Sequence, residues 1–140
     1  MGEYVQVIKG NLLHAKEDII GHQVNAQGVM GAGLATEIKS RYPEAFERYK
    51  ELCITEKKGR HLLGTCQIIK SKDKYIANIF GQHKFGRKGV FTEVDALKKA
   101  LYSLKVRAQK YNLSVAIPCY LGCGLAGGDW QEEIGRKSLK

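Results

Sequence analysis

Short apolar runs alternate along the chain with amphipathic segments, which is the pattern of an α/β protein. Apolar side chains predict strands at 4–8, 19–24, 62–70, 75–81 and 115–118. Apolar residues at helical spacing predict helices over 33–41, from Pro43 onward and from about Val94 onward. A turn-like segment at 71–74 joins two of the strands and predicts a hairpin, hence one antiparallel pair. The chain should therefore form three layers, α/β/α, around a mixed, mostly parallel sheet.

Two signals predict where helices begin. Pro43 suits the first helical turn, where its missing N–H costs nothing. Thr92 should cap the later helix, because an acidic residue, Asp95, follows three positions on. The apolar residues of that helix form one stripe, which consists of Val94, Leu97, Leu101, Leu104 and Ala108.

Two glycine-rich segments, 24–35 and 118–128, each follow a predicted strand and lead towards a helix. Such a junction can aim backbone N–H groups at a phosphate, and two of them can hold a diphosphate. A tight turn is the alternative for the first segment and a flexible loop for the second. Because a strand precedes the second and Leu125 is apolar, ligand binding is favoured there. The first is neither a dinucleotide fingerprint, since Thr36 replaces its third glycine, nor a P-loop.

Several polar residues near these loops are candidates for chemistry, each with a structural alternative. Asn25 suits a ribose hydroxyl or a plain turn. His22 suits a general acid or nucleophile at the pocket edge, or a buried, hydrogen-bonded core histidine. The basic loop 82–88 suits a cover over an anionic ligand or a solvated connection. Asp129 suits a catalytic carboxylate or a helix cap.

Composition narrows the function classes. The 140 residues suit one domain, 1–140, and 23 basic against 14 acidic residues give a net charge of +9. Such a surface attracts nucleic acid and small anions, or merely aids solubility. The four cysteines predict reduced thiols in a cytoplasmic protein without metal; a metal site on Cys119, Cys123, His61 or His83 is the alternative. A monomer is expected. No apolar run is long enough to span a membrane.

Taken together and in order, these segments resemble the macrodomain family of ADP-ribose binders, over nearly the whole chain. The subgroup most similar contains ADP-ribose-1″-phosphate phosphatase-like and terminal ADP-ribose glycohydrolase-like proteins. The segments that carry the resemblance are Lys9-Gly10-Asn11-Leu12-Leu13, His22-Gln23-Val24-Asn25, Met30-Gly31-Ala32-Gly33-Leu34-Ala35, Arg41-Tyr42-Pro43, Leu62-Leu63-Gly64, Asn78-Ile79-Phe80-Gly81-Gln82 and Gly122-Cys123-Gly124-Leu125.

The resemblance implies a role for each matching position. Asn11 stands where macrodomains usually carry an Asp that reads the adenine amino group, and Leu12 lines the adenine pocket. The two glycine loops hold the diphosphate and the distal ribose, and Asn25 faces that ribose. The implied ligand-binding residues are Asn11, Leu12, Gln23, Asn25, Met30, Gly31, Ala32, Gly33, Leu34, Pro118, Gly122, Cys123, Gly124, Leu125, Ala126 and Gly127. The candidate catalytic residues are His22, Gln82 and Asp129, and no cofactor is expected.

The sequence departs from the family pattern at three places. Glycohydrolase-like members use a Lys and an Asp, and the corresponding positions here are Gln82 and Ala126, with Lys84 or Asp129 as candidates to compensate. Another catalytic pattern has a further Asn where this chain has Gly28. The chain ends soon after Trp130, where family members continue through a longer helix and a final strand.

Three functions follow from these features. The first is hydrolysis at the distal ribose of ADP-ribose-1″-phosphate or an ADP-ribosyl ester, by an ordered water that His22, a carboxylate or the substrate diphosphate activates. The second is an ADP-ribose-binding module without turnover. The third is a basic domain that binds nucleic acid and is indifferent to ADP-ribose.

Overall fold

The computed structural model describes residues 5–8, 11–31, 33–84, 92–118 and 121. Its strands are β1 (Val5–Ile8), β2 (Ile19–Asn25), β3 (Cys66–Ser71), β4 (Lys74–Gln82) and β5 (Val115–Pro118). Its helices are α1 (Gly33–Arg41), α2 (Pro43–Thr55) and α3 (Val94–Lys110), with short 3-10 turns η1 (Leu12–His14) and η2 (Arg60–Leu62).

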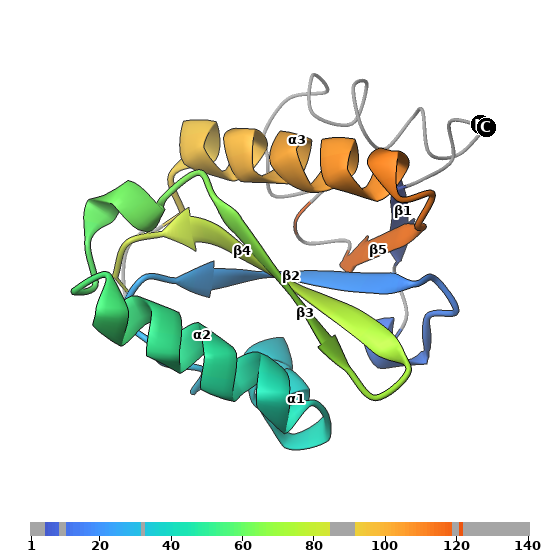
Figure 1. Ribbon diagram of the computed structural model, residues 1–140, viewed down its shortest axis with the longest axis horizontal. Coiled ribbons are helices and arrows are strands. Elements are labelled where there is room, and N and C mark those ends of the chain that lie inside the picture. Colours follow the sequence, from blue (N-terminus) through green and yellow to red (C-terminus); the bar gives the residue numbers. More distant parts are fainter. Residues whose placement is uncertain (1–4, 9–10, 32, 85–91, 119–120, 122–140) are drawn as a thin grey trace.

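The strands form one sheet in the order β1-β5-β2-β4-β3. The pairs β1–β5, β5–β2 and β2–β4 are parallel, and β3 pairs with β4 in the antiparallel sense. In Figure 1, α3 lies over one face of the sheet, and α1 and α2 lie over the other. The predicted three-layer α/β/α fold with a mixed, mostly parallel sheet is confirmed.

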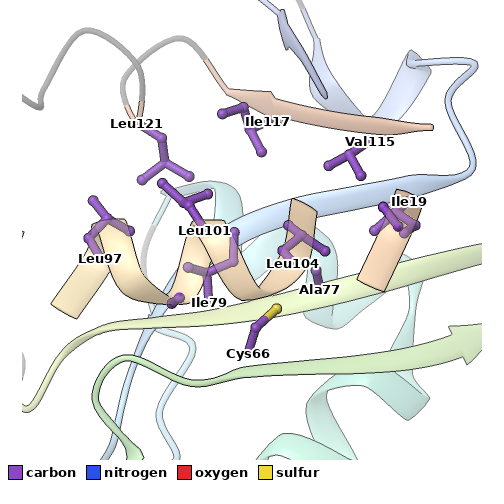
Figure 2. Packing of buried hydrophobic residues seen from close by; sticks show 12 residues of the cluster. Ile19, Cys66, Ala77, Ile79, Leu97, Leu101, Leu104, Val115, Ile117 and Leu121 are labelled. Atoms are coloured by element: carbon purple, nitrogen blue, oxygen red, sulfur yellow. The ribbon is translucent and has the colours of Figure 1, made fainter. Parts of the chain in front are cut away.

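The layer between α3 and the sheet holds the largest group of buried apolar side chains. Leu97, Leu101 and Leu104 of α3 are each at most 2% exposed and face the sheet (Figure 2). The sheet side of this layer contributes Ile79 of β4 and Ile117 of β5 among others. The predicted apolar stripe is therefore correct except at Val94, which is 42% exposed at the start of the helix.

The opposite face is covered by α1 and α2. Ile38 of α1 packs in a cluster with Ile20 of β2 and Ile76 of β4. Further along α2, Tyr49 packs with Val24 and Phe80, at the end of the sheet where β2 and β4 finish. Both faces of β2 are therefore enclosed, which explains its apolar sequence.

Two boundaries differ from the sequence prediction. Strand β3 begins at Cys66 and not at 62, because Leu62 belongs to η2 and Gly64 then takes a left-handed φ of 86°. Thr92 does not cap α3: the helix begins at Val94 after Glu93, and Thr92 instead forms a bridge with Gln82. A local sequence signal cannot foresee either result, since both arise from contacts with β4.

A chain of buried hydrogen bonds crosses from β2 to α2 on the second face. His22 Nε2 lies 2.7 Å from Asn78 Oδ1 of the neighbouring strand. Asn78 Nδ2 donates to Ala45 O and to Gln67 Oε1, and Gln67 Nε2 donates to Arg48 O. Because the Asn78 amide nitrogen is committed to two oxygens, its own oxygen must accept from His22. His22 Nε2 therefore carries the proton of this hydrogen bond.

This enclosure controls the charge of His22. The side chain is 0% exposed, and burial lowers its pKa from 6.5 to about 4, against the opposing effect of the Asn78 hydrogen bond. Its Nδ1 is buried and has no hydrogen-bond partner within the described segments. A proton added to the ring would therefore enter an apolar layer without a counter-charge, which is costly.

We predict that the free energy of unfolding falls as the pH is lowered from about 6.5 to about 4. The pKa of His22 is lower in the folded protein than in the unfolded chain, so the unfolded chain binds the proton first. The His22 contribution is complete above pH 6.5 and diminishes by up to about 3 kcal/mol towards pH 4. Urea unfolding of the wild type and of His22→Asn at a series of pH values measures it. The variant should lack this component; the same pH dependence in both proteins would contradict the assignment.

Candidate functional site

The predicted ligand-binding residues gather at one edge of the sheet. Because β1, β5, β2 and β4 run parallel, their carboxyl ends lie at the same edge. Asn11 follows β1, Pro118 ends β5, Asn25 ends β2 and Gln82 ends β4. In Figure 1 the arrowheads of β2 and β4 point to the same side of the molecule. The structure thus brings together residues that are far apart in sequence.

Asn25 organises the loop that joins β2 to α1. Its Oδ1 accepts from Gln27 N at 2.9 Å and lies 2.7 Å from the Tyr49 hydroxyl, and its Nδ2 donates to Val29 O at 3.0 Å. The side chain is 7% exposed. These bonds correspond to the turn that the sequence left open as an alternative to a ribose contact. The Asn25 side chain thus stabilises the loop by hydrogen bonds to its backbone.

Tyr49 of α2 is the second organiser of this loop. Its hydroxyl accepts from Val29 N at 3.1 Å and lies 2.7 Å from both Asn25 O and Asn25 Oδ1. Burial raises the pKa of Tyr49 well above its usual value, so the hydroxyl stays protonated. The apolar spacing of α2 predicts burial of Tyr49 but no role for its hydroxyl. Its hydroxyl links the helix layer to the candidate site.

The glycines after this loop border open space. Gly33 opens α1 with a left-handed φ of 57°, and no described atom lies within 4 Å of the position that a Cβ would take. At Gly31 a Cβ would meet only Val29 Cγ1, at an ordinary 3.6 Å. Met30, which precedes Gly31, is buried, and Leu34, which follows Gly33, packs partly against the core. The loop is therefore anchored by Met30 and leaves room beside Gly31 and Gly33.

The residues that follow β1 lie at the other end of this edge. Asn11 is exposed and caps η1, and its Oδ1 accepts from Leu13 N at 2.9 Å. Leu12 is only 3% exposed and packs in the core with Ile20. Asn11 is thus the member of this pair whose side chain reaches the surface.

The two glutamines lie near the end of β4. Gln23 Nε2 donates to Thr92 Oγ1 at 3.0 Å, on the α3 face of the sheet. A Cβ on Gly81 would come within 2.3 Å of Gln23 Oε1, so a larger residue there would displace the Gln23 amide. Gln82 is partly buried and pairs with Asn25 across the strands. Gln23 therefore acts as a link between β2 and the start of α3.

His22 is separated from this edge by its burial. Its ring lies between the sheet and α2, with the Asn78 contact described above. This placement favours the buried core histidine over a residue at the pocket edge. In the sequence, Asn78 stands out only as part of the segment 78–82 that resembles the family, and Gln67 has no assigned role, because the contacts of both residues arise from strand pairing.

Several predicted site residues lie outside the described residues. They are Ala32, Asp129, the loop 85–89 and the second glycine segment with Gly122, Cys123, Gly124, Leu125, Ala126 and Gly127. Their roles stay predictions from sequence. Leu121, which directly precedes that segment, is 2% exposed and packs under α3 with Ile117.

The described cysteines are unsuited to nucleophilic chemistry. Burial raises the pKa of Cys53 to about 11 and that of Cys66 to about 12, so both thiols stay protonated near neutral pH. No group of three or more His, Cys, Asp or Glu side chains suited to a metal occurs within the described residues. No helix in the described part is long and apolar enough to cross a membrane.

Comparisons with known proteins match this arrangement. The family model of the Macro domain matches residues 22–134. The chain is 32% identical over 128 residues to the DNA ADP-ribosyl glycohydrolase of Mycobacterium tuberculosis, covering 88% of this chain and 34% of that protein. It is 41% identical over 69 residues to the ADP-ribose 1″-phosphate phosphatase of Candida glabrata, covering 48% of this chain and 37% of that protein. The chain thus spans about a third of the length of these relatives.

Solved structures agree on the fold. The macrodomain of Mycobacterium tuberculosis DarG is 28% identical, with a TM-score of 0.70 over 94% of this chain and 85% of that one. The macrodomain of Thermus aquaticus DarG is 26% identical, with a TM-score of 0.70 over 96% and 87%. Sequence match and fold therefore lead to the same conclusion, and the predicted resemblance is confirmed: the chain belongs to the macrodomain family.

Proposed function

We propose that this protein binds ADP-ribose along the carboxyl edge of its sheet and hydrolyses a bond at C1″ of the distal ribose. Strands lie about 4.8 Å apart, so the edge from β1 to β4 spans roughly 14 Å. That length suits an elongated nucleotide diphosphate. Adenine would lie by Asn11, the diphosphate by the start of α1, and the distal ribose by Asn25 and Gln82.

The observation that carries this proposal is the open start of α1 at Gly33. Nothing described occupies the space beside it, and the first turn of α1 contains no acidic side chain. The N–H groups and the positive end of the helix dipole therefore lack an anionic partner within that turn, as an anion-binding helix requires. A diphosphate supplies the missing charge.

The chemistry is a water-dependent cleavage. The water oxygen forms the new bond to C1″, the acceptor leaves with the electron pair of the broken bond, and the water proton passes to a phosphate oxygen of the substrate. Backbone N–H groups of the loops stabilise the charge that develops. Gln82 carries an amide where glycohydrolase-like members have a lysine, so the proposed reaction forms no covalent intermediate at this position. The enclosed His22 positions β2 against α2.

The names of the relatives support hydrolysis, since they describe a DNA ADP-ribosyl glycohydrolase and an ADP-ribose 1″-phosphate phosphatase. A binding module without turnover is the second candidate. The amide at Gln82 and the burial of His22 favour it, because neither supplies an exposed nucleophile or base.

Two measurements separate these candidates. Calorimetric titration with ADP-ribose, with AMP and ADP as controls, tests the site itself. Release of ADP-ribose from an ADP-ribosylated oligonucleotide, and of phosphate from ADP-ribose-1″-phosphate, tests turnover. Micromolar ADP-ribose binding with product release supports the hydrolase. Binding without release supports the module, and a folded protein that fails to bind ADP-ribose contradicts both.

We predict that Gly33→Glu reduces ADP-ribose affinity at least tenfold, which is about 1.4 kcal/mol. The carboxylate would repel the diphosphate at the start of α1. A negative charge near a helix N-terminus stabilises the helix, so unfolding does not account for the loss. Gly33→Gln is the matched control, because it has the same size and the same backbone strain without the charge. Calorimetry should show a clearly smaller loss for it; equal affinity of the two variants would refute the placement of the diphosphate.

We predict that Tyr49→Phe weakens ADP-ribose binding by roughly three- to tenfold and lowers the stability by about 1 kcal/mol. The ring and its packing against Phe80 remain, but Val29 N and the Asn25 side chain lose a hydrogen-bond partner. Calorimetry and urea unfolding measure the two effects. Tyr102→Phe is the control, because Tyr102 is 64% exposed on α3. Full ADP-ribose affinity in Tyr49→Phe would show that the loop does not depend on this hydroxyl.

A further inference from the structure

Three exposed lysines lie beside the end of the candidate site that holds Asn25. Lys57 and Lys58 follow α2, and Lys84 follows β4. The two segments are joined at this edge, because His83 Nε2 lies 3.0 Å from Lys58 O. In Figure 1 the chain after α2 lies on the same side as the arrowheads of β2 and β4. We call these three lysines the basic rim.

The basic rim is attached to the loop after β2. His83 O accepts from Ala26 N at 3.1 Å and from Gln27 Nε2 at 2.9 Å. His83 therefore connects the loop at Asn25 on one side with Lys58 on the other. The rim holds a defined place next to the candidate ribose position.

The two carboxylates near the rim contact other side chains. Glu56 Oε1 lies 2.7 Å from His61 Nε2, and Glu93 Oε1 lies 2.8 Å from Arg60 Nη2. Within the described segments the three rim lysines form no ion pair. The rim thus places three positive charges on two separate chain segments, and none of them is paired with a carboxylate in the part of the chain that the structure describes.

The order of the strands determines what this cluster meets. ADP-ribose that runs from Asn11 towards Asn25 follows the sheet from β1 to β2, and its distal ribose ends beside β4. The group bonded to C1″ therefore extends out of the site past the basic rim. A single phosphate there needs one cation. A polynucleotide presents a row of phosphates, which several separate lysines can contact.

We propose that the basic rim of Lys57, Lys58 and Lys84 binds backbone phosphates of a single-stranded polynucleotide that carries the ADP-ribosyl group. The inference rests on the proposed function, which supplies the direction of ADP-ribose in the site. The rim adds affinity for the acceptor, whereas the glycine loop binds the ADP-ribosyl part. The two contributions are separable, since only the rim contacts should weaken steeply with salt.

The test compares two double variants that remove the same charge. Lys57→Gln/Lys58→Gln alters the rim, and Lys70→Gln/Lys72→Gln alters the hairpin at the opposite edge of the sheet. Both variants include left-handed positions, namely Lys57 and Lys58 with φ of 55° and 53° in the rim and Lys72 with φ of 59° in the hairpin. The substrate is a single-stranded DNA 20-mer with one ADP-ribosyl group, and kcat/KM for ADP-ribose release is measured at increasing NaCl.

The rim variant should lose roughly tenfold in kcat/KM at low salt, and its slope against log salt should decrease by about 1.4, for two phosphates at about 0.7 each. The hairpin variant should remain within twofold of the wild type, and free ADP-ribose should bind all three proteins with similar affinity by calorimetry. Equal kcat/KM values for the two variants overturn the inference. So does a wild type that binds ADP-ribose without cleaving the 20-mer. A wild type that fails to bind ADP-ribose refutes the proposed function itself.

Discussion

The parallel pairing of β2 with both β4 and β5 is the constraint on which the rest of the structure depends. It brings the ends of several strands to one edge, so residues from distant parts of the sequence become neighbours. It also requires both faces of β2 to be covered, by α3 on one side and by α1 and α2 on the other. The site is thus a consequence of the sheet, because its loops begin where enclosed strands end.

A central strand that is enclosed on both faces can hold polar side chains only if their hydrogen bonds are made inside the protein. His22 and Asn25 meet this requirement in different ways. His22 uses Asn78 to connect β2 with α2, and Asn25 uses its own loop together with the Tyr49 hydroxyl. Both therefore serve to position the elements around the ligand. The space beside Gly33 adjoins the backbone at the start of α1. Backbone N–H groups suit an anion, because no side chain has to lose conformational freedom when the anion binds.

Sequence patterns predicted the layers and most strands because each element has its own periodicity, as the stripe of Leu97, Leu101 and Leu104 demonstrates. They placed the start of β3 too early and assigned the α3 cap to Thr92, because Gly64 and Thr92 contact β4 and this pairing exists only in the folded sheet. The helical spacing of Tyr49 says nothing about what the hydroxyl at the end of its ring contacts. The role of His22 depends likewise on Asn78 of the neighbouring strand, and its position within its own strand does not reveal this contact.

In the proposed function, the glycine loop binds the ADP-ribosyl part and the rim lysines bind the acceptor, and this division affects selectivity. A helix start and glycine loops bind a diphosphate whatever group it carries, so they cannot by themselves distinguish one acceptor from another. In the proposed function, discrimination has to come from side chains beyond the place assigned to the distal ribose, where the described surface presents lysines on the segments after α2 and β4. Exposed lysines are weakly constrained in direction but add attraction for every phosphate within a screening length. Such a surface favours a flexible polyanion of any base sequence over a compact neutral acceptor. In the proposed reaction, binding of the ADP-ribosyl group determines which bond is cleaved.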